Sequence, residues 1–311
     1  MSKIFITGIN GFVGKHLIDE YKEDEIFGLV KDSTGEDLGG NVRTFQGDIL
    51  DSDGIEKIIA EVKPNIIFHL AALTSPAESL KNPVETINNN ISGQLNILEA
   101  VRNLEVDCKM LVVSSAEVYG NVSEKNIPTS ENSELLPNTP YGVSKATQDL
   151  LGYQYYKSYG LKNVRVRPFN HIGPGQVPVF VVSAFAKQIA MIEKGQQEKV
   201  IKVGNLAPKR DFTDVRDVVK AYKLLMEKGK FGEVYNVGSG KSYEISEILN
   251  ILMSFSTEKI EVVEDPLLVR SVDIKELRCD FTKLKNDTGW EPEIPIEKSL
   301  QDTLDYWRDI I

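Results

Sequence analysis

Residues 3–167 alternate short apolar segments with longer segments whose apolar residues recur at helical spacing. The short segments have the length of strands, and the longer ones have the period of amphipathic helices. Strands that alternate with helices form parallel sheets with right-handed crossovers and helices on both faces. The sequence therefore predicts an α/β fold with a doubly wound parallel sheet. The predicted strands are 3–7, 26–30, 43–46, 66–70, 110–114 and 164–167, and the predicted helices are 13–20, 52–62, 86–104 and 143–159.

This alternation stops after residue 167. Prolines and glycines crowd residues 168–178, which predicts a loop. We expect a first domain over residues 1–168, to which about 213–238 return, and a smaller, discontinuous mixed α/β substrate domain over residues 169–311. In that second part the predicted elements are 181–193, 198–203, 215–228, 234–237, 245–254, 260–263 and 296–308.

The composition narrows the function classes. The chain of 311 residues is 41% hydrophobic, enough for a large core, and carries a formal net charge of −10. This acidic balance argues against a nucleic-acid or membrane-surface binder. Two cysteines far apart in sequence, and the lack of a signal-peptide pattern or a long apolar run, favour the reducing cytoplasm. We expect no metal site.

A glycine-rich segment follows the first predicted strand and opens the first predicted helix. Gly8, Gly11 and Gly14 permit a tight turn and a close approach of the backbone to a pyrophosphate. The helix that follows directs its free N–H groups at the phosphates. This arrangement predicts a dinucleotide-binding domain of the Rossmann type. The residues of this segment predicted to bind the cofactor are Gly8, Asn10, Gly11, Phe12, Val13 and Gly14.

The end of the second strand decides which dinucleotide is preferred. NAD-binding domains usually place an acidic residue there for the ribose 2′-hydroxyl, and this position falls on Val30. Lys31 comes next and can hold the 2′-phosphate of NADP, whereas Asp32 is one place later. The sequence favours NADP, although a shift of one residue in register would favour NAD.

The following strand ends also point at the cofactor. Residues after the third strand are placed to meet the adenine ring, and small residues after the fourth strand leave room for the cofactor. We interpret His69 as a core histidine. The predicted contacts are Asp48, Ile49, Leu70, Ala71 and Ala72.

Tyr141 and Lys145 lie four residues apart, which places them on one face of a helix. An ammonium beside a phenol stabilises the phenolate, so we expect Lys145 to lower the pKa of Tyr141. Such a phenol can exchange a proton with an alcohol or a ketone. Ser115 ends the fifth strand, where it can hydrogen-bond a substrate oxygen, and Glu117 is a candidate acid or base.

Short motifs follow one another along nearly the whole chain. They are Gly8-x-x-Gly11-x-x-Gly14, Gly47-Asp48-Ile49, His69-Leu70-Ala71-Ala72, Asn90-x-x-Gly93, Ser114-Ser115, Tyr141-x-x-x-Lys145, Arg167-Pro168-Phe169-Asn170, Arg210-Asp211-Phe212, Tyr235-Asn236-Val237-Gly238 and Thr288-Gly289-Trp290-x-Pro292. In these motifs and their order the chain resembles the extended short-chain dehydrogenases/reductases, in the nucleotide-sugar (epimerase/dehydratase) branch. The segments 169–176 and 203–212 resemble the group that acts on GDP-linked 6-deoxyhexoses.

This resemblance implies further site residues. It assigns cofactor contacts to Asn90, Ser114, Phe169 and His171, besides Tyr141 and Lys145. It assigns substrate contacts to Asn170, Asn205, Arg210 and Arg270, besides Ser115; arginine suits a diphosphate because it donates in a bidentate manner. The family also implies a homodimer through a four-helix bundle built by helices 86–104 and 143–159.

Ser115-Ala116-Glu117 separates two activities within this group. A 4,6-dehydratase eliminates water, which needs both a base and an acid, and sugar-nucleotide dehydratases usually carry Thr followed by Asp-Glu or Ser-Glu here. Alanine can neither donate nor accept a proton. The resemblance thus implies a reductase that uses NADPH to convert the C4 ketone of GDP-4-keto-6-deoxy-D-mannose to GDP-D-rhamnose.

Other activities remain open at this point. A GDP-mannose or other nucleotide-sugar 4,6-dehydratase is one alternative, because some dehydratases manage with the glutamate alone. A UDP-sugar 4-epimerase is another, since the Ser-Ser-Ala sequence also occurs there. A non-catalytic NADP-sensing protein is the remote alternative. Neither the nucleobase nor the C4 configuration of the product follows from the sequence.

Overall fold

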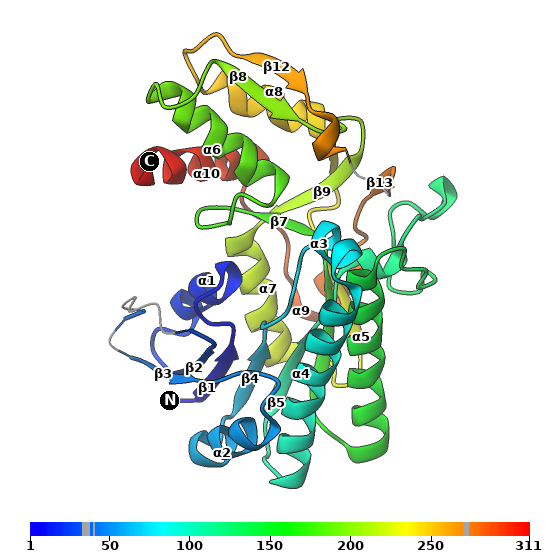
Figure 1. Ribbon diagram of the computed structural model, residues 1–311. Coiled ribbons are helices and arrows are strands. Elements are labelled where there is room, and N and C mark those ends of the chain that lie inside the picture. Colours follow the sequence, from blue (N-terminus) through cyan, green and yellow to red (C-terminus); the bar gives the residue numbers. More distant parts are fainter. Residues whose placement is uncertain (33–37, 40, 270–273) are drawn as a thin grey trace.

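The computed structural model of the 311-residue chain describes residues 1–32, 38–39, 41–269 and 274–311. Seven parallel strands from this described part form the main sheet (Figure 1). The first strand lies inside the sheet, between the second and the fourth, and the strand order reverses between the first and the fourth, so the predicted doubly wound parallel sheet is confirmed. In sheet order the strands are β10 (Val234–Val237), β6 (Asn163–Pro168), β5 (Lys109–Val113), β4 (Ile66–His69), β1 (Lys3–Thr7), β2 (Glu25–Val30) and β3 (Val42–Gln46).

Helices cover both faces of this sheet, and each face has its own apolar core. One core contains Leu17, Val218 and Leu284, and the opposite core contains Ile59 and Ile97. On the first face lie α1 (Phe12–Glu20), α7 (Val215–Lys228) and α9 (Thr282–Thr288), and on the second α2 (Ser52–Val62), α4 (Pro83–Asn103) and α5 (Pro140–Tyr159).

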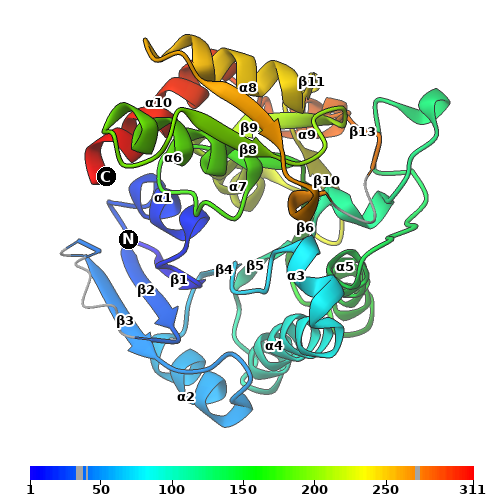
Figure 2. The same ribbon diagram turned by 45° about the horizontal axis from the view of Figure 1, so that its top comes forward.

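A smaller mixed layer lies beyond the carboxyl ends of the main strands (Figures 1 and 2). Its helices bury a separate apolar core that includes Phe185, Leu249 and Trp307. The strands here pair with segments that are distant in the sequence; β7 and β9, for example, align Asn170 with Phe212. The layer consists of β7 (Asn170–Ile172), α6 (Val181–Glu193), β8 (Val200–Val203), β9 (Lys209–Asp214), β11 (Ser242–Glu244), α8 (Ile245–Ser254), β12 (Glu261–Glu264), β13 (Glu276–Leu277) and α10 (Ile296–Ile310).

Several short elements differ from the sequence expectations. The segment 168–178, predicted as a loop, contains β7, and β9, β11, β13 and α9 were not expected. A short helix, α3 (Pro76–Lys81), follows β4, and a 3₁₀ turn, η1 (Ala116–Tyr119), follows β5. Along the described residues no helix has both the length and the apolar character needed to cross a membrane.

Candidate active site

Tyr141 opens α5, at the edge where the main strands end. The helix begins with two local signals: Thr139 accepts the amide of Gly142 at 3.0 Å, and Pro140 takes the first helical position. The main-chain N–H of Tyr141 donates to the hydroxyl of Ser79 on α3 at 3.1 Å. The start of α5 is therefore held from within and by a neighbouring helix.

Lys145 lies beside Tyr141 on the buried face of α5. The two residues are only 4% and 8% exposed, respectively, and the Lys145 ammonium lies 6.0 Å from the centre of the Tyr141 ring. Lys145 Nζ donates to the carbonyl of Val113 at the end of β5, at 2.9 Å. Tyr141 and Lys145 thus lie on one face of α5, as predicted, and this face is turned toward the end of β5.

The charge states of this pair differ from the sequence expectation. Burial raises the pKa of Tyr141 to about 12, although its hydrogen bond with Ser115 opposes this. Burial lowers the pKa of Lys145 to about 7. The expectation that Lys145 lowers the Tyr141 pKa is wrong for this structure, because both groups lose their hydration together. Tyr141 is therefore a neutral phenol at neutral pH.

Ser115 and Glu117 stand on the turn that faces Tyr141. Ser115 is 8% exposed, and its Oγ accepts the amide of Glu117 at 3.2 Å. The negative charge of Glu117 raises the Tyr141 pKa, which places the carboxylate near the phenol. A Cβ built on Gly142 would lie 2.9 Å from the Glu117 carbonyl oxygen, so the turn after Ser115 and the start of α5 meet backbone to backbone.

Ala116, between these two residues, does not share their polar surroundings. It is 3% exposed and belongs to an apolar cluster. Its partners include Val118, Phe169 and Leu277. A carboxylate at this position would lie in an apolar environment without its hydration.

The glycine loop after β1 has the close packing that dinucleotide binding requires. Gly8 has a φ of +72°, and a Cβ there would lie 3.0 Å from the Ala71 amide nitrogen. A Cβ on Gly14 would lie 2.5 Å from the Ile9 carbonyl oxygen, so α1 packs directly on the loop. Gly11 precedes α1 and leaves the first amides of the helix uncovered by any side-chain cap of its own. These residues fit a bound pyrophosphate.

Aromatic residues flank this loop. Phe12 stacks on His171 with ring centres 6.0 Å apart and planes 9° from parallel. His16 Nε2 lies 2.9 Å from the Pro174 carbonyl oxygen. Phe169 is buried against Tyr119. Thus His171 lies beside the glycine loop, whereas Phe169 lies in the core behind the site.

Lys31 and Asp48 pair at the rim, where β2 and β3 end. Lys31 Nζ lies 3.1 Å from Asp48 Oδ2, and the two side chains are 70% and 38% exposed. The hydrogen bond that Lys31 donates to Asp48 raises the pKa of Lys31, while the Leu50 amide and Lys31 lower the pKa of Asp48. The predicted 2′-phosphate cation therefore already has an anionic neighbour. Val30, the last residue of β2, occupies the position usual for an acid in NAD-binding domains.

The segment after β4 is anchored to β1. The Ala71 amide donates to Thr7 Oγ1 at 3.1 Å, and the same hydroxyl bonds to His69 Nδ1 at 2.9 Å. Burial lowers the pKa of His69 to about 3, so the imidazole is neutral. Its position agrees with the interpretation as a core histidine, and Leu70, Ala71 and Ala72 remain partly exposed.

Two predicted cofactor residues act from behind the site. Asn90 is fully buried; its side chain accepts the Leu73 amide at 2.8 Å and donates to the Leu73 carbonyl at 3.0 Å and to Ser144 Oγ at 2.9 Å. Ser114 is 1% exposed and donates to the Lys145 carbonyl at 3.0 Å. Their side chains hold the loop after β4 and the helix α5 in place and are not exposed at the site.

Asn96 extends this support from α4 toward the adenine end of the site. Its side-chain amide donates to the carbonyl of Ile49 at 2.9 Å. Ile49 itself packs against α4, since a Cβ on Gly93 would lie 2.9 Å from its side chain. The loop after β3, with Asp48, is thereby fixed to the same helix as the loop after β4.

The predicted substrate residues come from the smaller layer. Asn170 is exposed and opens β7, next to β9. Arg210 on β9 is 8% exposed, and its guanidinium donates to the Ile274 carbonyl at 2.6 Å. Asn205 is exposed and accepts the Ala207 amide at 3.1 Å. Arg270 lies outside the described residues.

Sequence reasoning missed Ser79, whose hydroxyl accepts the main-chain N–H of Tyr141. Its hydroxyl also donates to the Pro76 carbonyl at 2.7 Å and is fully buried. A signal was present, because Ser75-Pro76-Ala77-Glu78 has the spacing of a helix start, and Ser75 does cap Glu78 in α3.

Comparison with known proteins gives consistent matches over the whole chain. The family model described as GDP-mannose 4,6 dehydratase matches residues 5–303. GDP-6-deoxy-D-mannose reductase of Pseudomonas aeruginosa is 36% identical over 305 residues, which are 98% of this chain and 97% of that protein.

Solved structures agree with this match. The structure of RMD from Pseudomonas aeruginosa complexed with NADPH has a TM-score of 0.88 at 33% identity and covers 100% of both chains. UDP-glucose 4-epimerase from Thermotoga maritima with UDP-glucose has a TM-score of 0.90 at 31% identity and covers 99% of both. A reductase and an epimerase thus share this fold closely, so the fold alone does not separate the two reactions.

Proposed function

The chain belongs to the GDP-mannose 4,6-dehydratase family of short-chain dehydrogenase/reductase-type nucleotide-sugar enzymes, and from this premise we propose that it reduces the C4 ketone of GDP-4-keto-6-deoxy-D-mannose to GDP-D-rhamnose with NADPH. The observation that carries the choice of a reduction is Ala116. A 4,6-dehydratase moves a proton from C5 and another to the leaving hydroxyl, and sugar-nucleotide dehydratases usually carry two acid–base groups on this turn for these transfers. On this turn only Glu117 carries a carboxylate, and Ala116 lies in an apolar cluster.

The protonation state of Tyr141 also supports a ketone reduction. Ketone reduction ends with protonation of an alkoxide, for which a neutral phenol is the required form. Burial keeps Tyr141 in this form, since its pKa is raised to about 12. Tyr141 donates the proton, and Ser115, which bonds to it, orients and polarises the carbonyl. NADPH supplies the hydride.

Lys145 contributes to this reaction from the same helix. Its pKa of about 7 means that it exchanges its own proton near neutrality. We propose that it binds the nicotinamide ribose and stabilises negative charge on Tyr141 after proton transfer. Its bond to the Val113 carbonyl keeps the ammonium between β5 and the phenol.

The rim at the end of β2 supports NADPH over NADH. Val30 offers no acceptor for a ribose 2′-hydroxyl, and Lys31 offers a cation for a 2′-phosphate. The relative from Pseudomonas aeruginosa whose structure matches was solved with NADPH. NADH remains the alternative, because Asp48 neutralises part of the Lys31 charge.

The test offers the purified protein GDP-4-keto-6-deoxy-D-mannose with NADPH or NADH and follows absorbance at 340 nm. We expect oxidation of NADPH and a product with the D-rhamno configuration by NMR. The matched UDP-linked ketosugar tests the nucleobase. Conversion of GDP-mannose to a ketosugar without added reductant would assign a dehydratase instead, and interconversion of UDP-glucose and UDP-galactose would assign an epimerase.

The outer faces of α4 and α5 support a homodimer. Val84 and Leu150 are 69% and 57% exposed, Val143 is 41% exposed, and Ile87 and Ile91 are partly exposed on the same side. Such a patch on two adjacent helices suits a four-helix bundle with a second copy. We expect a dimer by light scattering and a monomer for Leu150→Glu. A monomeric wild-type protein would contradict this proposal.

A further inference from the structure

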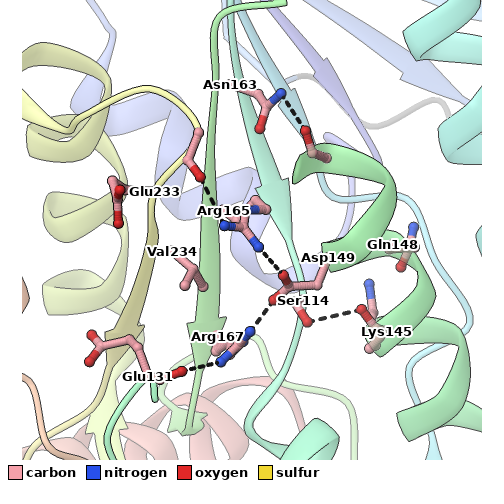
Figure 3. A network of polar contacts seen from close by, with 12 residues as sticks. Ser114, Glu131, Lys145, Gln148, Asp149, Asn163, Arg165, Arg167, Glu233 and Val234 are labelled. Carbon is pink, nitrogen blue, oxygen red and sulfur yellow. Dashed lines mark hydrogen bonds and ion pairs between the residues drawn. The ribbon is translucent and has the colours of Figure 1, made fainter. Parts of the chain in front are cut away.

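The helix face that carries Tyr141 and Lys145 continues to a buried ion cluster. Asp149 follows Lys145 by four residues on α5 and is fully buried. Its Oδ1 lies 2.5 Å from Arg165 Nη1, and its Oδ2 lies 2.7 Å from Arg167 Nε (Figure 3). Both arginines lie on one face of β6, because they are two residues apart on a strand.

The two arginines bind Asp149 alike but lead to different parts of the molecule. Arg165 donates to the Gly232 carbonyl at 2.8 Å and lies over the ring of Tyr153. Arg167 donates to the Glu131 carbonyl at 3.0 Å, as Figure 3 shows, and lies over the ring of Tyr119. The first branch leads to the segment before β10, away from the catalytic residues.

The Arg167 branch leads to the catalytic residues. Arg167 Nη1 also donates to the Tyr119 hydroxyl at 3.0 Å, and that hydroxyl donates to Asn236 Oδ1 on β10 at 2.6 Å. Tyr119 ends the η1 turn that begins directly after Ser115 and contains Glu117. Glu131 lies in the segment that leads to Thr139, where α5 begins.

Arg167 therefore contacts each of the segments that must meet for catalysis. These are the helix with Tyr141, the turn with Ser115, and the loop that leads into Tyr141. The contacts are buried, with Arg167 itself 5% exposed, so water does not replace them easily. The backbone contact between Gly142 and Glu117 would open if η1 moved away from α5.

We propose that Arg167, held by Asp149, is a positioning residue that fixes Ser115 and Glu117 relative to Tyr141. It touches neither substrate nor cofactor. The proposal rests on the proposed ketoreductase function for its kinetic readout, and on the geometry above for its structural readout. Arg165 is the matched control, because it has the same charge, the same carboxylate partner, a similar burial and an aromatic ring beneath it.

The test compares Arg167→Met with Arg165→Met, each of which keeps the aliphatic stem and leaves Asp149 with one arginine. We expect similar decreases in melting temperature for both. For Arg167→Met we expect kcat to fall on the order of 10- to 100-fold with little change in KM, because misplacement of catalytic groups by about 1 Å costs this much. For Arg165→Met we expect kcat within about threefold of wild type. Parallel losses of kcat in both variants, or an unchanged kcat in Arg167→Met, would overturn the proposal.

Tyr119→Phe keeps the test decisive if Arg167→Met does not fold. It removes the hydroxyl between Arg167 and Asn236 without leaving a buried charge. We expect kcat to fall by about threefold or more at unchanged NADPH affinity. An unchanged kcat in this variant would also overturn the proposal.

Amide hydrogen exchange separates this proposal from the proposed function. If wild-type protein fails to reduce the ketosugar, the ketoreductase assignment fails, but exchange in the peptide 115–120 still reports on positioning. We expect faster exchange there in Arg167→Met than in Arg165→Met. Equal exchange in the two variants would contradict positioning, whatever reaction the enzyme catalyses.

Discussion

The proposed catalytic wall of this site, formed by Ser115, Tyr141 and Lys145, and its proposed cofactor rim, formed by Lys31 and Asp48, are built in opposite ways. Ser115, Tyr141 and Lys145 are each at most 8% exposed, whereas Lys31 and Asp48 are 70% and 38% exposed. Burial shifts the pKa values of Tyr141 and Lys145 strongly, whereas hydrogen bonds dominate at the rim: Asp48 raises the pKa of Lys31, and the Leu50 amide and Lys31 lower the pKa of Asp48. Charges in the wall interact in a low dielectric, and charges at the rim are screened by water and salt. Substitutions in the wall should therefore have large effects that depend on pH, and substitutions at the rim small effects that depend on salt.

The largest effect is expected for Tyr141→Phe, which removes the proton donor from the wall. Loss of a general acid typically costs about 10²- to 10⁴-fold in rate. We expect such a loss of kcat with NADPH affinity unchanged, measured by absorbance at 340 nm and by cofactor fluorescence. Turnover at the wild-type rate would refute the role given to Tyr141.

Lys145→Met tests the burial of charge through the pH dependence of stability. The pKa of Lys145 falls from 10.5 in the unfolded chain to about 7 in the folded protein. Between these values the unfolded state holds the proton that the folded state has lost, so the free energy of unfolding rises with pH, by at most about 1.4 kcal/mol per unit. The stability gained by deprotonating Lys145 is fully present above pH 10.5 and is lost as the pH falls to about 7.

Urea unfolding of wild type and Lys145→Met between pH 6 and 9 measures this contribution. We expect the stability of the variant relative to wild type to be greatest at the low end and to decrease as the pH rises. A pH-independent difference would mean that Lys145 is not desolvated as the structure indicates.

Ser79→Ala should have an intermediate effect, because Ser79 lies on α3 and contacts the wall through the main-chain N–H of Tyr141. The variant leaves the buried Tyr141 amide without its acceptor, which typically costs about 1–3 kcal/mol. We expect this loss in urea unfolding together with a reduced kcat. Ser75→Ala, which removes the cap of α3 but not this bond, is the control and should lower stability with a smaller change in kcat.

The smallest effect is expected at the rim. Exposed ion pairs contribute roughly 0.2–1 kcal/mol, so Lys31→Ala should change the NADPH/NADH preference by no more than about fivefold. The change should shrink in high salt, as measured by the ratio of kcat/KM for the two cofactors. Arg43→Ala, which breaks the exposed Arg43–Glu61 pair at the opposite end of β3, should leave the preference unchanged. A salt-independent change would contradict a screened contact.

The wall and the glycine loop could be predicted because their signals are local. Gly8, Gly11 and Gly14 follow a strand, and the spacing of Tyr141 and Lys145 is that of one helix face. The family inferred from these motifs is confirmed by the match over residues 5–303. The charge states could not be predicted, because burial, which opposes the effect of the neighbouring charge, arises only when α5 packs on β5.

The substrate side was predicted less completely for a related reason. β7, β11 and β13 are only two or three residues long, and each pairs with β9, a segment distant in sequence; β13, for example, aligns Leu277 with Arg210. No periodicity develops over such short segments. Arg210 was identified from its motif, but its bond to the Ile274 carbonyl depends on that same distant pairing.

A pair of glutamines joins α4 to α5. Gln94 donates to the carbonyl of Gln148, and Gln148 donates to the carbonyl of Asn90, both at 2.8 Å. Each amide is committed to the main chain of the other helix, so a slide by one helical turn, about 5.4 Å, would break both bonds. We therefore expect the two helices to move together. Because α4 holds the loops after β3 and β4, and α5 carries Tyr141, we expect a motion of this helix pair to shift Tyr141 together with the loops predicted to bind the cofactor, which would keep the distance between them.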